Sequence, residues 1–375
     1  MIVGIDTRAA KWYRGTGIGT YTYQLINSIN EVDSINKYVL FSSEDSVLNI
    51  SLKDNFKLNN IAQENNSCFW DEVRIPNIIQ GENIELYHLP QNGVGLPMDK
   101  KCPFIITLHD VIPLKKPDTV SDRYLKVFNE DLPKLIPLCD GIITVSNHSK
   151  NDINKAFNYP KEKIFVTYLA AENIYKPFNK SLCKSLISEK YSLEDDFILY
   201  IGGFSPRKNI LSLIEAYSML PPKVIETTSL VIAGNKGISF EKYKKRTVEL
   251  KIENKVIFPG FIPLEDLPIF YNAAKVFVYP SFYEGFGLPP IEAMACGTPV
   301  IASNVTSIPE ICENSCLLIN PYDVFELKSA MVNILSDNNL CDDLIKKGFE
   351  KASSFNWSRT AINTIDAYKK VLELK

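Results

Sequence analysis

Two glutamates, Glu284 and Glu292, stand at the two ends of a short stretch rich in glycine and proline, which reads EGFGLPPIE. A carboxylate accepts hydrogen bonds from paired hydroxyl groups and stabilises developing positive charge. Glu292 could therefore bind the ribose diol of a nucleotide, and Glu284 could bind a sugar beyond its phosphates. For Glu292 the alternative is a structural role, because a glutamate in the first turn of a helix stabilises the helix dipole.

The residues around the two glutamates predict a strand–loop–helix–strand unit. An apolar run at 276–279 precedes the loop, a helical pattern at 291–296 follows Pro289 and Pro290, and another apolar run covers 298–302. Proline is tolerated at a helix start, because its missing N–H is not needed there. The amino end of this helix would present free N–H groups and partial positive charge, which suit a phosphate.

A basic pair, Arg207 and Lys208, lies earlier in the second half of the chain. It follows the apolar run 197–201 and two glycines, and a helical pattern begins after Asn209. A junction between a strand end and a helix start favours anionic groups, so the pair is expected to bind a diphosphate. The alternative is two solvated charges on a loop.

Three glycines, Gly15, Gly17 and Gly19, precede a helix that is expected to start near Thr20. Too many residues separate them from the first strand, residues 2–5, for the tight turn of a dinucleotide-binding motif. One interpretation is a flexible connection. The other is a mobile flap whose N–H groups approach a ligand phosphate or an acceptor.

Apolar runs separated by helix-length segments predict two parallel sheets. The further runs are 37–42, 86–89, 104–108, 141–145 and 164–169 in the first half, and 229–234 and 256–258 in the second. Because ligands gather at the carboxyl ends of such strands, His109, which follows 104–108, is a candidate for chemistry. Asp110 is expected to orient this histidine or its loop. The alternative for His109 is a structural histidine with satisfied hydrogen bonds.

The composition is that of a soluble globular chain with room for two domains. Of 375 residues, 45% are hydrophobic and 23% are charged, and the net charge of -3 argues against a nucleic-acid partner. Eight scattered cysteines lack the spacing of a zinc site and suit reduced thiols in the cytoplasm. There is no Asp-x-Asp to hold a metal, no signal peptide, and no run of about 18 apolar residues.

The segment EGFGLPPIEAMACGTPV resembles the Glu-x7-Glu signature of family four, the group 1 glycosyltransferases, which are retaining enzymes that use nucleotide sugars. The resemblance implies an α/β protein of the GT-B fold, with two Rossmann-like domains whose parallel sheets face a central cleft. The expected domains are residues 1–180 and 190–356, and a last helix at 357–375 is expected to pack back on the first domain.

The resemblance also implies roles for individual residues. ITLHDVIP is similar to the family's first-domain strand, whose histidine contacts the transferred sugar, which favours His109. The run RKN resembles the element that grips the diphosphate. This chain departs from many relatives by having Gly203 where they carry arginine, so either Arg207 supplies the guanidinium or the site depends on Lys208.

Further residues match the donor-binding part of the family. In relatives, a glycine loop after the first strand closes on the donor, which favours the flap interpretation of Gly15, Gly17 and Gly19. The residues that match Phe261 and Ile262 clasp the base, largely through the backbone. Around the signature, the matching donor contacts are Phe286, Gly287 and Leu288, with Leu288 near the ribose.

The first-domain runs GIDTR, GIGTYTYQL and VTYLAAE look most like bacterial mannosyl- or rhamnosyltransferases of surface polysaccharide assembly. This favours a GDP-mannose donor, with a UDP-glucose-type donor second, no cofactor and no metal. The expected acceptor is a hydroxyl of a glycan or a lipid-linked molecule, which allows peripheral contact with a membrane from the cytoplasm. The rival functions are a sugar phosphorylase, a nucleotide-sugar epimerase and a catalytically inactive binding subunit.

Overall fold

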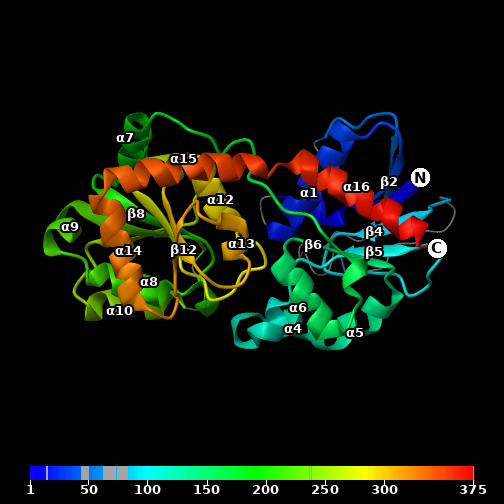
Figure 1. The fold of residues 1–375 in the computed structure, drawn as a ribbon, viewed down its shortest axis with the longest axis horizontal. Coiled ribbons are helices and arrows are strands. Elements are labelled where there is room, and N and C mark those ends of the chain that lie inside the picture. Colours follow the sequence, from blue (N-terminus) through cyan, green and yellow to red (C-terminus); the bar gives the residue numbers. More distant parts are fainter. Residues whose placement is uncertain are drawn as a thin grey trace. The chain divides into compact units, whose positions relative to one another are not determined.

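The computed structural model describes residues 1–13, 16–43, 50–61, 73, 83–235, 237 and 239–374. The chain divides into two compact units (Figure 1). Unit 1 comprises Met1–Leu169 and Asn356–Lys375, and unit 2 comprises Ala170–Phe355. Each unit is built around one parallel sheet with helices packed on it.

Unit 1 contains a seven-stranded sheet with the order β3-β2-β1-β4-β5-β6-β7. The strands are β1 (Ile2–Asp6), β2 (Lys37–Ser43), β3 (Phe56–Ile61), β4 (Leu86–Leu89), β5 (Phe104–Thr107), β6 (Gly141–Thr144) and β7 (Ile164–Val166). In the centre, Ile5 of β1 pairs with Leu40 of β2 on one side and His88 of β4 on the other. Apolar side chains fill both faces of the central strands, as expected for a parallel sheet covered by helices.

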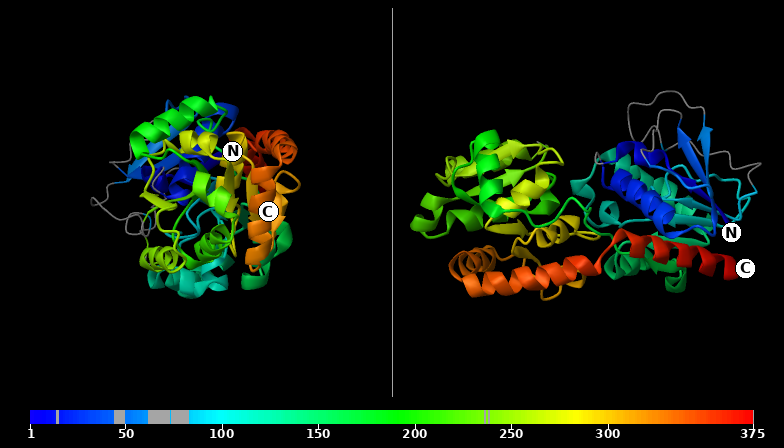
Figure 2. Two further views of the ribbon diagram at one scale, coloured as in Figure 1. Left: turned by 90° about the vertical axis from the view of Figure 1, so that its left-hand side faces the viewer. Right: turned by 90° about the horizontal axis from the view of Figure 1, so that it is seen from above.

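The longer helices of unit 1 are α1 (Gly17–Val32), α6 (Asn147–Phe157) and α16 (Trp357–Glu373). Its short helical elements are η1 (Arg8–Trp12), α3 (Ile112–Lys115), η2 (Pro117–Thr119), α4 (Asp122–Lys126), η3 (Val127–Asp131), α5 (Leu132–Leu135), η4 (Ile136–Leu138) and η5 (Lys161–Lys163). The first and last long helices, α1 and α16, pack against each other (Figures 1 and 2).

The helical segment 122–138 changes its hydrogen-bonding pattern along its length. It consists of α4, a π-helical turn η3, α5 and the 3-10 turn η4. Pro133 has no N–H to donate to the preceding turn, which explains a local departure from α-helix. Phe128, Leu132 and Ile136 are buried in the core of unit 1, so this face of the segment packs on the domain.

Unit 2 contains a six-stranded sheet with the order β10-β9-β8-β11-β12-β13. The strands are β8 (Asp196–Ile201), β9 (Thr228–Ala233), β10 (Val256–Gly260), β11 (Val276–Tyr279), β12 (Val300–Ser303) and β13 (Leu317–Ile319). The helices are α7 (Lys180–Tyr191), η6 (Pro206–Lys208), α8 (Ile210–Ser218), α9 (Pro222–Thr227), α10 (Phe240–Glu249), α11 (Leu267–Ala273), α12 (Leu288–Ala295), α13 (Ile308–Cys312), α14 (Val324–Ser336) and α15 (Asn338–Ser354).

The structure contains two strands that the apolar runs did not predict, β3 and β13. Helix α7 covers the gap left between the expected domains, 1–180 and 190–356. Because α7 packs against α11, it belongs to unit 2, and the contact boundary falls at Leu169 and Ala170.

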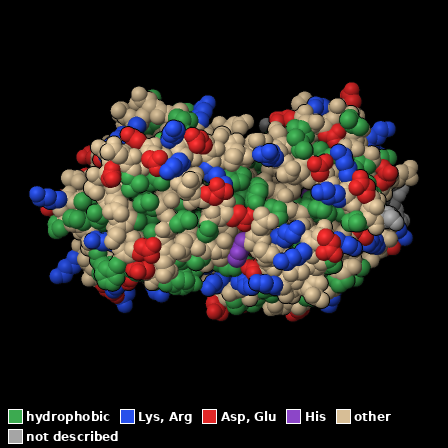
Figure 3. Space-filling view, in the orientation of Figure 1, with side chains coloured by type: hydrophobic (Ala, Val, Ile, Leu, Met, Phe, Trp, Pro, Cys, Tyr) green, Lys and Arg blue, Asp and Glu red, His purple; other side chains and the backbone are tan. Residues whose placement is uncertain are grey.

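The described cysteines are free thiols, and all of them except Cys341 are buried. None of the helices in the described ranges is long and apolar enough to span a bilayer. On the face drawn in Figure 3, basic and acidic side chains are interspersed over each unit.

Candidate active site

A buried cluster of one acidic and two basic side chains joins the two motifs of unit 2. The carboxylate of Glu284 lies 2.6 Å from the ammonium nitrogen of Lys208 and 3.0 Å from a guanidinium nitrogen of Arg207. At most 18% of any of the three side chains is exposed. The basic turn and the acidic loop, which are far apart in sequence, therefore form one site.

The electrostatics of Glu284 are set by this cluster. Burial alone would raise the pKa of its carboxyl group, but the charges of Arg207 and Lys208 outweigh burial and hold the pKa at about 2. Glu284 is therefore ionised at neutral pH. With two cations and one anion, the cluster carries one surplus positive charge.

Tyr279, the last residue of β11, is a further partner of Lys208. The ammonium nitrogen of Lys208 lies 2.6 Å from the Tyr279 hydroxyl and 4.8 Å from the centre of its ring. The lysine is thus held from two sides, by Tyr279 and Glu284. The apolar run 276–279 predicts only a strand. Nothing near it in the sequence indicates the contact with Lys208, because the two residues are distant in the chain.

Asn209 fixes the turn that carries the basic pair. Its backbone has the left-handed conformation, with a φ angle of 58°, which asparagine tolerates better than most residues. Its side-chain amide donates to the carbonyl oxygens of Pro280 and Pro321, at 3.1 and 2.7 Å. The amide of Phe282 also donates to the carbonyl of Arg207, at 2.8 Å. The basic turn is therefore bound to the carboxyl end of β11.

The loop that carries Glu284 is held by Thr306 and Ser307. The Thr306 hydroxyl accepts a hydrogen bond from the Glu284 amide at 3.1 Å, and the Ser307 hydroxyl donates to the carbonyls of Glu284 and Phe286 at 3.0 and 2.8 Å. Thr306 has a φ angle of 59°, which is strained for a β-branched residue. Backbone strain of this kind clusters at functional sites.

Glu292 lies on α12 and forms a second polar group. Its carboxylate accepts a hydrogen bond from Tyr271 at 2.8 Å, and the Tyr175 hydroxyl is a further partner. Burial, only partly opposed by the two tyrosines, raises the pKa of Glu292 to about 7. Because α12 begins at Leu288, Glu292 is its fifth residue. The expectation of a first-turn position, and with it the helix-dipole explanation, was wrong.

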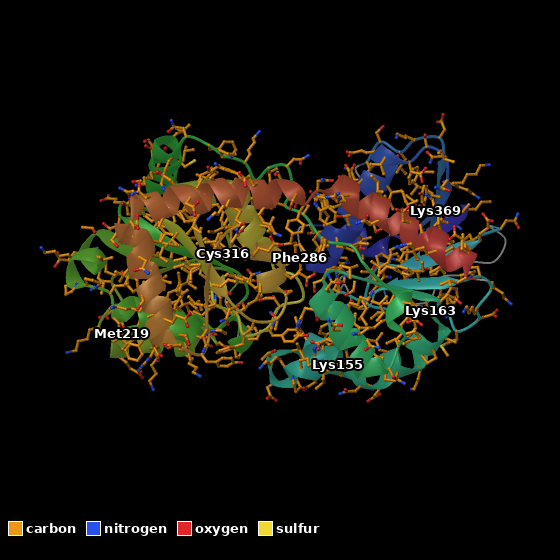
Figure 4. All side chains as sticks on the ribbon, viewed as in Figure 1. Lys155, Lys163, Met219, Phe286, Cys316 and Lys369 are labelled. Atoms are coloured by element: carbon orange, nitrogen blue, oxygen red, sulfur yellow. The ribbon has the colours of Figure 1, made fainter. Side chains whose placement is uncertain are left out.

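The other expected donor contacts of unit 2 differ in exposure. Phe261 is 64% exposed, whereas Ile262 is buried. The ring of Phe286, labelled in Figure 4, is buried edge-on against Phe355. Phe286 can therefore offer a ligand only its backbone.

Gly287 and Leu288 mark the start of α12. Gly287 is the N-cap residue, with a φ angle of 112°, and a Cβ atom there would lie 2.6 Å from Ile308. Only glycine fits this turn without strain. Leu288, the first residue of the helix, is half-buried.

Two of the three glycines near the amino terminus lie in a helix instead of the expected loop. Gly17 and Gly19 lie in the first turn of α1, which starts before the predicted Thr20, and Gly15 lies outside the described residues. A Cβ atom at Gly19 would collide with the carbonyl oxygen of Trp12 and lie 2.9 Å from that of Ala9, so this glycine lets α1 pack on η1. A Cβ atom at Gly17 would meet nothing within 4 Å.

His109 follows β5 in unit 1, as expected. Its backbone amide donates to Asn92 at 2.9 Å, and its ring lies edge-on to Tyr21 with the ring centres 4.7 Å apart. Its Nε2 lies 3.3 Å from the carbonyl oxygen of Pro90, which can only accept. Burial lowers the pKa of His109 to about 4, so the ring is neutral at pH 7. Asp110 accepts from the Ile112 amide and orders the loop.

His88 lies in a buried polar chain that leads to Tyr21, the residue whose ring contacts His109. Its ring nitrogens lie 2.7 Å from the Tyr368 hydroxyl and 2.8 Å from the Thr107 hydroxyl, and Thr107 lies 3.1 Å from the Tyr21 hydroxyl. This chain links the C-terminal helix α16 to the residues that support His109.

Two family models match the chain, one in each half. Residues 16–170 match "Glycosyltransferase Family 4", and residues 185–351 match "Glycosyl transferases group 1". The chain is 31% identical over 373 residues to O-antigen chain mannosyltransferase B of Escherichia coli, covering 95% of this chain and 97% of that protein. It is 34% identical over 230 residues to O-antigen chain mannosyltransferase RfbU of Salmonella typhimurium, covering 61% and 60%. The chain belongs to the group 1 glycosyltransferases, and it resembles their O-antigen mannosyltransferases.

Solved structures share the fold. Sucrose-phosphate synthase of Thermosynechococcus elongatus superimposes with a TM-score of 0.76 at 21% identity over all of both chains. The glycosyltransferase WaaG, involved in lipopolysaccharide biosynthesis, gives a TM-score of 0.67 at 14% identity over 98% of both chains. The expected GT-B fold, with two α/β domains around parallel sheets, is thereby confirmed.

Proposed function

We propose that this glycosyltransferase moves a hexose, with mannose favoured, from a nucleoside diphosphate sugar to a hydroxyl group of a glycan acceptor, with retention of the anomeric configuration. The observation that carries the proposal is the buried cluster of Arg207, Lys208 and Glu284, followed along the same loop and helix by Glu292. The similarity to O-antigen chain mannosyltransferases supports mannose as the sugar and surface polysaccharide assembly as the process.

In this proposal, unit 2 binds the donor. Arg207 and Lys208, next to the amino end of α8, stabilise the negative charge that grows on the diphosphate as it leaves. Glu284 holds the sugar hydroxyls and the positive charge at the anomeric carbon. Glu292 accepts hydrogen bonds from the ribose hydroxyls, and Phe261 and the backbone of Ile262 hold the base. His109 of unit 1 contacts the transferred sugar as a neutral ring.

The reaction exchanges one bond at the anomeric carbon for another on the same face. The bond from the carbon to the diphosphate oxygen breaks while the bond to the acceptor oxygen forms. The acceptor proton passes to an oxygen of the leaving diphosphate, so no protein carboxylate is needed as a general base. Because both bonds are exchanged on one face, none is needed as a covalent nucleophile. The two basic side chains supply the charge that a bridging metal would supply, and we propose that the enzyme needs no metal.

The donor is tested first by thermal-shift screening and then by turnover. GDP-mannose should raise the melting temperature more than UDP-glucose, and should release GDP when a mannoside acceptor is present. Chelation of divalent metals should leave the rate unchanged. The product stereochemistry, read by NMR, should match that of the donor. Consumption of inorganic phosphate in place of a glycan would instead identify a phosphorylase, and no turnover with any donor would contradict the proposal.

The roles of the two glutamates are separated by substitution. Glu284→Gln should abolish turnover while the nucleotide dissociation constant changes little. Glu292→Ala should weaken nucleotide binding about tenfold, because it removes acceptors for the ribose hydroxyls. Full activity in Glu284→Gln would show that Glu284 does not act in the reaction.

A further inference from the structure

A half-buried ring, Phe282, and an exposed ring, Tyr322, lie together beside the acidic loop, and the exposed Phe325 follows Tyr322 by three residues. We name these three side chains the aromatic platform. The rings of Phe282 and Tyr322 are stacked, with their centres 4.8 Å apart and their planes at 24°. Tyr322 is 66% exposed and Phe325 is 71% exposed. Two exposed aromatic side chains so close in sequence, one of them stacked on a third ring, are typical of a binding surface.

The platform is attached directly to the candidate active site. Phe282 lies two residues before Glu284, and its amide donates to the carbonyl of Arg207. Asn209, which follows the basic pair, donates to the carbonyl of Pro321, next to Tyr322. The same backbone contacts therefore position the platform and the cluster of Arg207, Lys208 and Glu284.

The backbone beneath the exposed rings is ordered by local hydrogen bonds. The Asn320 side chain accepts from the Tyr322 amide at 3.0 Å, and Asp323 caps α14 by accepting from the amides of Phe325 and Glu326. The rings are thus presented on a fixed frame, which lowers the entropy cost of binding. Asn320, Asp323 and Glu326 also place polar side chains on the same segment as Tyr322 and Phe325.

We propose that the aromatic platform binds sugar units of the glycan acceptor, so that a growing chain rests on it next to the transfer site. A pyranose has an apolar C–H face that packs on an aromatic ring and hydroxyl groups that suit the polar rim. Three side chains fall far short of the area that a stable protein interface buries, which favours a glycan over a protein partner. This inference rests on the proposed function, because it assigns part of that enzyme's acceptor site.

The test compares variants that remove the rings with variants that keep them. The double variant Tyr322→Ala, Phe325→Ala removes both exposed rings. Tyr322→Phe keeps all three rings and removes only the Tyr322 hydroxyl, so it should bind the oligosaccharide as the wild type does. Leu182→Ala, at a position on α7 that is 59% exposed, is the matched control for loss of exposed apolar surface. All these side chains are exposed, so unchanged melting temperatures are expected.

For each protein, the dissociation constant of a mannose oligosaccharide is measured by calorimetry without nucleotide. The dissociation constant of GDP and the KM values for the oligosaccharide and for a single-sugar alkyl mannoside are measured separately. The double variant should weaken oligosaccharide binding and raise its KM about tenfold, because it loses two ring contacts. GDP affinity, kcat and the KM for the single-sugar acceptor should stay at the wild-type values, as should every value for Leu182→Ala.

Each outcome separates this inference from the proposed function. If the wild type transfers mannose and the double variant binds the oligosaccharide equally well, the platform is not an acceptor site and the proposed function stands. If oligosaccharide binding depends on the rings but no donor is turned over, the platform stands and the proposed function fails. A change of oligomeric state in the double variant, with oligosaccharide binding unchanged, would assign the patch to a second copy of the chain and overturn the inference.

Discussion

Glu284 and Lys208 form an ion pair in the interior of unit 2, with 2.6 Å between the carboxylate oxygen and the ammonium nitrogen and only 8% and 11% of their side chains exposed. Removing one partner of a buried pair leaves an uncompensated charge in a poorly solvated position. We therefore expect Glu284→Ala to lower the free energy of unfolding by about 3 kcal/mol, in addition to its effect on turnover. Chemical denaturation measures this loss.

The control for this substitution is Glu215→Ala, which breaks a more exposed pair with Arg246. Such a pair contributes about 1 kcal/mol or less to stability. The free energy of unfolding of this variant should therefore remain close to that of the wild type. If both variants lost the same small amount of unfolding free energy, the buried pair would not stabilise unit 2.

The pKa of Glu292, which burial raises to about 7, predicts that donor binding depends on pH. The carboxyl group is protonated below this pKa and ionised above it, and the ionised form is the better acceptor for two ribose hydroxyls. The affinity for a nucleotide sugar should therefore rise as the pH increases through about 7. Calorimetric titrations across this range provide the measurement, since the diphosphate of a nucleotide sugar does not titrate there.

Two controls assign this pH dependence to Glu292. The affinity of Glu292→Gln for the nucleotide sugar should not change with pH. The affinity of the wild type for a 2′-deoxyribose donor analogue should rise less with pH than its affinity for the normal donor. An unchanged slope in Glu292→Gln would assign the titration to another group.

Gly17 and Gly19 should respond in opposite ways to alanine, although both lie in the first turn of α1. At Gly19 the added Cβ atom would collide with the backbone of Trp12, so we expect a lower melting temperature. At Gly17 the added atom meets nothing, and the loss of glycine's freedom in the unfolded chain should stabilise the protein by about 0.5 kcal/mol. Thermal denaturation of the two single variants tests this. A Gly19→Ala variant as stable as the wild type would contradict the packing role.

His88 should make unit 1 sensitive to acid. Burial, with a smaller contribution from His109, lowers the pKa of His88 to about 3. Below its usual value of about 6.5, the unfolded chain binds a proton that the folded chain excludes, so stability falls as the pH decreases. At pH 5 this costs roughly 2 kcal/mol relative to pH 8.

The melting temperature followed from pH 8 to about pH 5 measures this effect. His88→Gln, which has no titrating group in this range, should flatten the profile and can still bond to Tyr368 or Thr107. The His88→Gln variant retains His109, whose pKa is also lowered by burial, so a smaller slope should persist in it. If the melting temperature of His88→Gln depended on pH as that of the wild type does, His88 would be excluded as a source of acid sensitivity.

Much of the fold could be predicted because central strands of parallel sheets are continuous apolar runs. β4 and β11 have the expected bounds. β3 was missed because its sequence, FKLNNI, mixes polar and apolar residues, as suits the edge of a sheet. The start of α12 was placed too late, because the left-handed backbone of Gly287, and not the proline pair, determines where that helix begins.

The residues of the candidate site could be predicted from the sequence, but the contacts between them could not. The motifs identified Arg207, Lys208, Glu284 and Glu292, yet nothing local in the sequence indicates that Glu284 pairs with the basic turn. Tyr279 contacts Lys208, and Tyr271 contacts Glu292. In the sequence, these two tyrosines are indistinguishable from ordinary apolar positions of a strand and a helix. Their roles depend on distant partners, which only the fold brings together.

Unit 1 is assembled from both ends of the chain, since α16 packs on α1 and Tyr368 bonds to His88. On the ribosome, α16 emerges after all of unit 2, so unit 2, which is contiguous in sequence, can be completed while unit 1 still lacks a helix. The core of unit 1 can therefore close around residues 1–169 only after residues 356–375 have been synthesised. A nascent chain that stops before residue 356 would leave α1 uncovered and is a natural client for chaperones.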